Sequence, residues 1–174
     1  MDKLIKNNII LIGFMGVGKG TVARALVKAT SSFAVDTDDL IESLENKKIK
    51  KIFAENGEPY FRELEQKCAL WCEKNLTNTI ISTGGGFYRQ KNIHKIGKVI
   101  YLQSTFEAII EGLKNAPNSA KKFKKRPLLN DLIEAKKIYN QRVKEYEKVA
   151  DIIINVEDWS EKKAVKNILK ALEG

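Results

Sequence analysis

The sequence has few residues of the kinds that build disulfide scaffolds or zinc sites. Its 174 residues include two cysteines and one histidine, and they form no CxxC pair and no mixed cluster with metal-ligand spacing. Cys68 and Cys72 lie four residues apart, which places them on one face of a helix and favours core packing over a disulfide. We therefore expect two reduced cysteines and no zinc site.

Long apolar runs are missing as well. No segment approaches the roughly 18 apolar residues of a membrane span, and the polar start of the chain does not resemble a signal peptide. The composition, 43% hydrophobic and 30% charged, is typical of a soluble globular protein. We expect a single domain over residues 1–174 that is cytoplasmic, monomeric and without membrane contact.

The net charge of +9 at pH 7 leaves three interpretations open. These are nucleic-acid binding, attraction of small anions, and a solvated lysine-rich surface. The densest basic run contains Lys121, Lys122, Lys124, Lys125 and Arg126. Because no aromatic-and-basic nucleic-acid motif accompanies this run, we expect no nucleic-acid partner. We assign the run to anionic small molecules and most other lysines to the solvated surface.

Short apolar runs rich in β-branched residues alternate with helical patterns along the chain. Strands are expected at 8–12, 33–35, 79–82, 98–102 and 152–156, and helices at about 21–30, 38–56, 58–75, 105–114, 131–149 and from 160 onward. This alternation predicts an α/β fold in three layers, with a five-stranded parallel sheet flanked by helices. Three strands end in polar or glycine-rich segments, and ligands bind at such carboxyl ends.

The first of these segments, Gly13 to Lys19, matches the G-x-x-x-x-G-K pattern of a P-loop, with a strand before it and a helix after it. Glycines let the backbone turn tightly and point its N–H groups at phosphate, and the following helix adds its positive N-terminal end. Lys19 has the length to reach the β- and γ-phosphates of ATP. The expected nucleotide-binding residues here are Gly16, Val17, Gly18, Lys19, Gly20 and Thr21.

The P-loop departs from the usual pattern at one position. A serine or threonine normally follows the lysine and binds Mg²⁺ through its hydroxyl group, whereas this chain has Gly20. Thr21 comes next but lies about 100° further round the helix. Three options stay open: Mg²⁺ held by phosphate oxygens, water and Asp36; Thr21 moving into reach as the ligand; or an impaired chain. We favour the first.

Several motifs taken together resemble the shikimate kinase family. They are GFMGxGK at 13–19, Asp36-Thr37-Asp38, Phe61-Arg62, Gly84-Gly85-Gly86, Arg126-Pro127-Leu128-Leu129 and Arg142. They occur in the family's order and span nearly the whole chain. The resemblance implies a P-loop kinase with a substrate-binding helical segment at about 37–65 and a mobile lid at about 114–127. It also implies the reaction: transfer of the γ-phosphoryl group of ATP to the 3-hydroxyl group of shikimate, with Mg²⁺.

The resemblance implies roles on the acceptor side of the site. Asp38 would accept a hydrogen bond from the attacking hydroxyl group and take its proton, which suits a carboxylate. Arg62 and Arg142 would bind the substrate carboxylate, whose two oxygens match the planar donors of a guanidinium group. Gly85 would donate its backbone N–H to the substrate.

On the nucleotide side, the resemblance makes Arg126 the lid residue that reaches the phosphates, so that the catalytic set is Asp38, Lys19 and Arg126. The lid has no second arginine to stack on adenine. Asp158 and Trp159 follow the last strand, in the region expected for the adenine pocket, although Trp159 could instead belong to the core.

Other interpretations of the same residues stay open. Asp36 and Asp38 could cap a helix, and Arg62 and Arg142 could form exposed ion pairs. The chain could also phosphorylate a different small acceptor, such as gluconate or a nucleoside monophosphate. A nucleotide-binding protein without catalysis is the remaining alternative, and Gly20 is its support.

Overall fold

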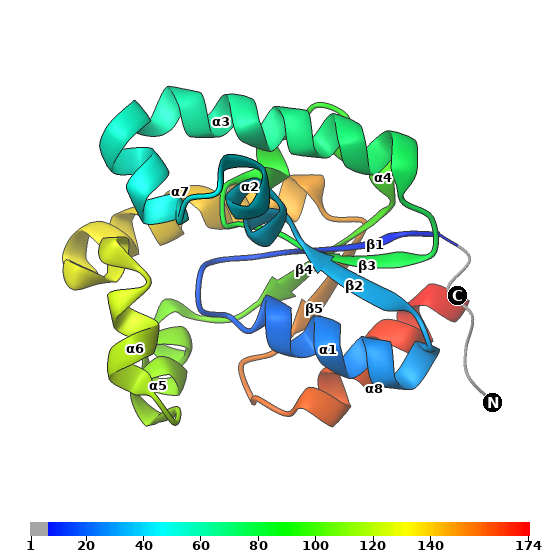
Figure 1. The fold of residues 1–174 in the computed structure, drawn as a ribbon. Coiled ribbons are helices and arrows are strands. Elements are labelled where there is room, and N and C mark those ends of the chain that lie inside the picture. Colours follow the sequence, from blue (N-terminus) through cyan, green and yellow to red (C-terminus); the bar gives the residue numbers. More distant parts are fainter. Residues whose placement is uncertain (1–6) are drawn as a thin grey trace.

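The computed structural model describes residues 7–174, so residues 1–6 of the expected domain lie outside the described part. At its centre is a five-stranded parallel sheet with the strand order β2-β3-β1-β4-β5 (Figure 1). The strands are β1 (Ile9–Ile12), β2 (Phe33–Asp36), β3 (Thr79–Ser82), β4 (Lys98–Gln103) and β5 (Ile152–Asn155). The expected α/β fold with a five-stranded parallel sheet is therefore confirmed.

Helices cover both faces of this sheet. They are α1 (Lys19–Thr30), α2 (Thr37–Glu45), α3 (Ile49–Asn75), α4 (Ile93–Ile96), α5 (Phe106–Asn115), α6 (Ser119–Lys124), α7 (Leu132–Val149) and α8 (Glu161–Glu173), with 3₁₀ turns η1 (Phe87–Arg89) and η2 (Pro127–Asn130). Helix α3 lies over one face, and α1 and α8 lie together against the other (Figure 1). All four residues of β1 are buried, as expected for a central strand covered on both sides. Within residues 7–174, no helix has the length and hydropathy of a transmembrane segment.

The sequence-based prediction of one helix at 38–56, after β2, is wrong, because the structure has two helices in this range. Helix α2 ends earlier, at Glu45, and Asn46 caps it with a φ of 49°, a left-handed conformation that asparagine tolerates. The expected break near Gly57 is confirmed, because its φ of 81° and ψ of 173° interrupt α3 with a kink two residues before Pro59. Cys68 and Cys72 are buried and unbridged in the same helix, as predicted.

The basic segment is also more ordered than its sequence pattern indicated. It contains the short helix α6 and the 3₁₀ turn η2, which together connect α5 to α7. In Figure 1 this connection lies beside α5, at the end of the molecule opposite the C-terminus. The expected lid at about 114–127 is thus a folded segment attached to helices on both sides.

Strand register brings three loop segments together at one edge of the sheet. Leu11 of β1 and Asp36 of β2 both pair with Ser82 of β3. Three segments therefore start close to one another at the carboxyl ends of the strands: the P-loop, the start of α2 and the triple glycine at 84–86. Strand β1 is also the point where the strand order changes direction. Strands β3 and β2 lie on one side of it, and β4 and β5 lie on the other. Ligands of open α/β sheets bind at such a point.

Candidate active site

The loop between β1 and α1 has the backbone shape of a phosphate cradle. Gly13, Gly16 and Gly18 have φ values of 150°, 83° and 107°, which residues with a Cβ rarely adopt. The Nζ atom of Lys19 donates hydrogen bonds to the carbonyl oxygens of Gly13 at 2.6 Å and Phe14 at 3.1 Å. The lysine side chain thus folds back over the loop. No side chain caps the start of α1, so its first amides stay available to an anion.

The two aspartates after β2 have different structural tasks. Oδ1 of Asp36 accepts hydrogen bonds from the amides of Asp38 at 2.9 Å and Asp39 at 3.3 Å, so Asp36 is the cap of α2. Asp38 lies in the first turn, and its Oδ1 atom is buried without a hydrogen-bond partner among the described residues. Burial, followed by the neighbouring charges of Asp36 and Glu65, raises the pKa of Asp38 to about 7. Asp38 is therefore a carboxyl group poised to exchange a proton near neutral pH.

The triple glycine at 84–86 passes directly against three charged side chains. A Cβ atom at its first position would lie 2.7 Å from Oδ1 of Asp38, and one at its second position 3.1 Å from Nη1 of Arg142. A Cβ atom at the third position would overlap the guanidinium group of Arg62. Glycine lets these side chains pack directly against the loop, because a Cβ atom at any of the three positions would push one of them away. The expected substrate-binding residues are thus brought together around one loop.

Arg62 is held in place by carboxylates of its own helix. Its Nη1 atom donates to Glu65 at 2.6 Å, and its Nη2 atom donates to Glu58 at 2.9 Å. Glu65 is 1% exposed, and burial raises its pKa although Arg62 opposes the shift. The pair with Glu65 is thus not the exposed ion pair that the sequence left open. The sequence did not single out Glu65, although it lies three residues after Arg62 on a helix, a spacing that allows an ion pair.

Arg142 approaches from α7, far along the chain from the other site residues. Its Nε atom is buried and, like Oδ1 of Asp38, has no hydrogen-bond partner among the described residues. Buried polar groups in folded proteins are rarely left without partners. A buried acceptor on Asp38 and a buried donor on Arg142, both against the triple glycine, therefore indicate a site for a polar ligand.

The pKa of Lys19 is shifted by burial and by several nearby charges. Burial lowers its pKa to about 8, Asp38 and Asp36 raise it, and Arg126 and Arg142 lower it further. Residues from the P-loop, from the start of α2, from the segment between α6 and η2 and from α7 thus act on one ammonium group. An anion with several negative charges, such as a nucleotide triphosphate, would favour the charged form of this lysine.

Arg126 is anchored within its own segment, the connection between α5 and α7. The Nη1 atom of Arg126 donates to the carbonyl oxygen of Lys122 at 2.7 Å, and partial burial lowers the pKa of its guanidinium group. On the other side of the P-loop, the ring of Trp159 lies against Gly18, where a Cβ atom would be 2.6 Å from Cη2 of the indole. Trp159 is 47% exposed and is not a core residue.

The space beside Gly20 would accept a larger side chain. A Cβ atom there would meet only Nη1 of Arg24, at 3.4 Å. The hydroxyl group of Thr21 accepts a hydrogen bond from Nη2 of Arg24 at 3.3 Å. In the described part of the chain, no group of three His, Cys, Asp or Glu side chains forms a ready metal site. The donor set near the P-loop therefore fits a cation held mainly by phosphate and water.

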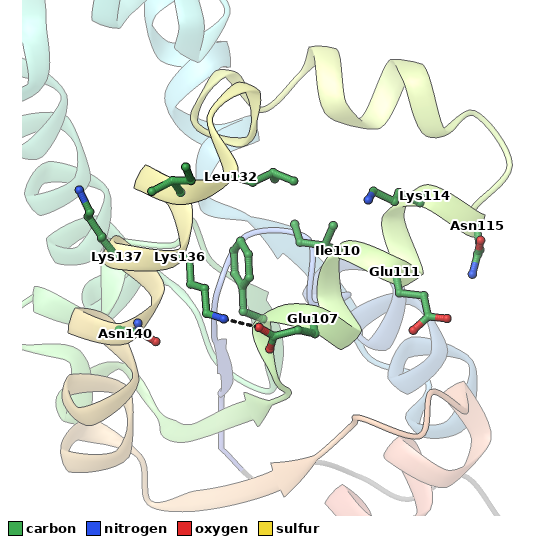
Figure 2. Close-up of a pocket in the computed structure, with 11 residues that line it drawn as sticks. Glu107, Ile110, Glu111, Lys114, Asn115, Leu132, Lys136, Lys137 and Asn140 are labelled. Carbon is green, nitrogen blue, oxygen red and sulfur yellow. Dashed lines mark hydrogen bonds and ion pairs between the residues drawn. The ribbon is translucent and has the colours of Figure 1, made fainter.

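A groove of about 680 Å³ opens elsewhere, between α5 and α7 (Figure 2). Ile110 and Leu132 lie along it, and an ion pair of 2.5 Å between Lys136 and Glu107 crosses it (Figure 2). None of the residues around Lys19 lines this groove. It is separate from the site at the strand ends.

Comparison with known proteins agrees with this geometry. A family model described as shikimate kinase matches residues 15–173. The chain is 38% identical over 148 residues to the shikimate kinase of Helicobacter hepaticus, covering 85% of this chain and 86% of that protein. It is 37% identical over 171 residues to the shikimate kinase of Sulfurihydrogenibium sp., covering 95% and 98% of the two chains.

Solved structures show the same similarity in three dimensions. The shikimate kinase of Acinetobacter baumannii in complex with shikimate superposes with a TM-score of 0.84 at 26% identity, covering 98% of this chain and 94% of that chain. The shikimate kinase of Aquifex aeolicus superposes with a TM-score of 0.77 at 33% identity, covering 96% of each chain.

Proposed function

Because the chain belongs to the shikimate kinase family, we propose that it transfers the γ-phosphoryl group of ATP to the 3-hydroxyl group of shikimate, giving shikimate 3-phosphate and ADP. It is a transferase of the kinase class. One observation carries the proposal: the site combines a P-loop lysine with a buried carboxylate oxygen. Lys19 lies on the nucleotide side, and Oδ1 of Asp38, which has no hydrogen-bond partner among the described residues, lies on the acceptor side.

The acceptor is oriented by its own carboxylate. Arg62 and Arg142 bind this group from α3 and α7, and the N–H of Gly85 adds a third donor. Asp38 then receives a hydrogen bond from the 3-hydroxyl group. Holding the hydroxyl oxygen in line with the γ-phosphorus supplies much of the catalysis in phosphoryl transfer.

The transfer step follows from this arrangement. The hydroxyl oxygen forms a bond to the γ-phosphorus as the bond from phosphorus to the β,γ-bridging oxygen breaks, and ADP carries the released electron pair. The proton of the hydroxyl group passes to the carboxylate of Asp38. Lys19, the P-loop amides and Arg126 place positive charge around the phosphoryl oxygens, where negative charge spreads in the transition state.

Mg²⁺ is the expected companion of ATP, and it would neutralise charge on the β- and γ-phosphates. Asp36 is the carboxylate at the end of β2 that would hold it through water. Its Oδ1 atom caps α2, so its second oxygen would make this contact. Thr21 is the less suitable ligand because its hydroxyl group already accepts from Arg24. We place the reaction in the cytoplasm, with a monomeric enzyme acting on small molecules and not on nucleic acid.

A coupled assay for ADP release tests the proposed function directly. The purified protein with ATP and Mg²⁺ should release ADP when shikimate is added, and it should not respond to gluconate or AMP. Nucleotide binding without turnover on any of the three acceptors would instead support a non-catalytic role. A response to gluconate or AMP alone would assign a different acceptor.

Replacing Gly20 with serine should strengthen the response to Mg²⁺. The side chain fits, since a Cβ atom there meets only the flexible end of Arg24, and its hydroxyl group restores the usual direct metal ligand. We expect half-maximal activity at a severalfold lower Mg²⁺ concentration and a higher kcat, measured by Mg²⁺ titration of the ADP-release assay.

Gly20→Ala is the matched control for this variant, because it adds the Cβ atom without the hydroxyl group. Both changes should stabilise the start of α1 to a similar degree, as glycine is a poor helix former. If the alanine and serine variants respond equally to Mg²⁺, the hydroxyl group is not a metal ligand in this chain.

A further inference from the structure

Tyr146 connects two parts of the acceptor site that lie far apart in the sequence. Its hydroxyl group donates a hydrogen bond to the carbonyl oxygen of Gly85 at 2.6 Å, across 61 residues. The residue is fully buried on α7, one helical turn after Arg142. Nη1 of Arg142 and the Tyr146 hydroxyl group lie beside Gly85, where a Cβ atom would be 3.1 Å and 3.8 Å from them. Burial raises the pKa of Tyr146, and the nearby charge of Arg142 opposes this shift. The hydroxyl group is therefore bonded to the triple glycine and lies close to the arginine beside it.

The ring of Tyr146 has little freedom to move. It packs edge-on against Tyr88, with ring centroids 4.7 Å apart, and is tilted against Tyr101 at 5.1 Å. Tyr101 belongs to β4, and Tyr88 belongs to η1, the 3₁₀ turn that follows the triple glycine. The Tyr88 hydroxyl group in turn donates to Glu145 of α7. The hydroxyl group of Tyr146 is thus held at a defined place between the sheet, the loop and α7.

The loop it contacts needs such a restraint. Three consecutive glycines have more backbone freedom than any other tripeptide, yet the Asp38, Arg142 and Arg62 side chains pack against them. A hydrogen bond to the middle carbonyl limits the rotation of the adjoining peptides. It therefore limits the directions in which the N–H of Gly85 can point.

We propose that Tyr146 is a positioning residue for acceptor binding: its hydroxyl group holds the Gly85 peptide and the Arg142 guanidinium group in the relative orientation that receives the carboxylate of the acceptor. The residue does not contact the reacting atoms. Its effect belongs to recognition of the acceptor and not of ATP, because its hydroxyl group bonds to Gly85 and lies close to Arg142, both on the acceptor side. This inference rests on the proposed function, since the acceptor is taken to be shikimate.

Tyr146→Phe tests the inference, because it removes the hydroxyl group and keeps the ring in its packing. We expect the KM for shikimate to rise on the order of tenfold, because a misplaced donor weakens a charge-assisted contact. The KM for ATP should change by less than about twofold, since the contacts of the P-loop are unaltered. In hydrogen exchange measured by mass spectrometry, the peptide that covers residues 83–88 should exchange faster than in the native protein.

Tyr139→Phe is the matched control. Tyr139 lies on the same helix, and its hydroxyl group also donates to a backbone carbonyl, that of Ser104, at 2.5 Å. Each variant loses one partly buried hydrogen bond from a tyrosine hydroxyl group to a backbone carbonyl, so each should lower the melting temperature by about 2–4 °C. Only the Tyr146 variant should show the selective rise in the KM for shikimate.

Three results would contradict the proposal. An unchanged KM for shikimate in Tyr146→Phe overturns it, and so does an equal rise in the Tyr139 control, which would indicate a general effect of lost stability. If Tyr146→Phe does not fold, hydrogen exchange in the native protein is the second test. Exchange of residues 83–88 as fast as in an unstructured peptide would show that the hydrogen bond from Tyr146 to Gly85 does not hold the loop, and would overturn the proposal. Native protein that turns over another acceptor but not shikimate overturns the proposed function and this inference with it.

Discussion

Replacing Asp38 with asparagine should lower kcat by about 10²-fold or more, the loss expected when a general base is removed. Asparagine has nearly the same shape and can still occupy the space beside the triple glycine, but its amide cannot take the proton of the 3-hydroxyl group. The affinity for ATP should stay almost unchanged, because Asp38 does not belong to the P-loop. Steady-state kinetics with shikimate, together with equilibrium binding of ATP, provide the measurement.

Asp39→Asn is the control for this change. Asp39 follows directly on the same helix and is exposed, and the two substitutions remove the same charge from the same turn. Its kcat should stay within a few-fold of the native value. If the two variants lose activity equally, the effect comes from the charge of the helix end and not from a base at position 38.

The native protein should also show the titration of Asp38 in its pH profile. Burial and nearby carboxylates raise the pKa of this group to about 7, so its basic form becomes scarce as the pH falls below that value. The kcat/KM for shikimate should therefore fall by up to tenfold for each pH unit below about 7, since this parameter reports the free enzyme. The asparagine variant has no such group, and its profile should be flat over this range.

Replacing Lys19 with methionine should have the second large effect, a loss of about 10²–10³-fold in kcat, as seen when one group that stabilises transition-state charge is removed. The ammonium group lies over the P-loop, held by the carbonyl oxygens of Gly13 and Phe14. A methionine of similar length fills this space but has no positive charge for the β- and γ-phosphates. Kinetics with ATP as the varied substrate give the measurement.

The loss of activity in Lys19→Met should not come from a loss of folding. Lys19 is 8% exposed, and burial lowers its pKa to about 8, so the native protein bears the cost of a buried charge there. The methionine variant should melt at the same temperature as the native protein or higher. Lys28→Met, an exposed change in the last turn of α1, is the control and should keep full activity. Full activity in the Lys19 variant would remove this lysine from the mechanism.

Much of the fold was predictable because its signals are local. Each strand of the sheet is a short apolar run in the sequence, and the alternation with helices predicts parallel pairing. The prediction was wrong where the local sequence pattern fitted more than one structure. The helical pattern at 38–56 continued through Asn46, yet the chain adopts a left-handed conformation there and starts a new helix. Similarly, the lysine-rich stretch carried no apolar stripe, so the short helix α6 was not expected.

The P-loop part of the site was the easiest to predict. Gly16, Gly18 and Lys19 lie within a few residues of one another, so their spacing alone determines the backbone shape and the reach of the lysine. The acceptor side was predictable only through resemblance to a family, because its residues come from α2, α3, the triple glycine and α7. Glu65 and Tyr146 were missed, since a buried glutamate and a core tyrosine have no distinctive sequence pattern.

The sequence by itself determined the alternation of strands and helices, the phosphate cradle and the chemical types of the groups near it. Only the tertiary structure decided which aspartate caps α2 and which is left buried without a partner, and only it brought Tyr146 to Gly85. The physical reason is the distance along the chain over which each interaction acts. Strand patterns and glycine turns depend on neighbouring residues, whereas burial, pKa and hydrogen bonds across 61 residues depend on how separate elements pack.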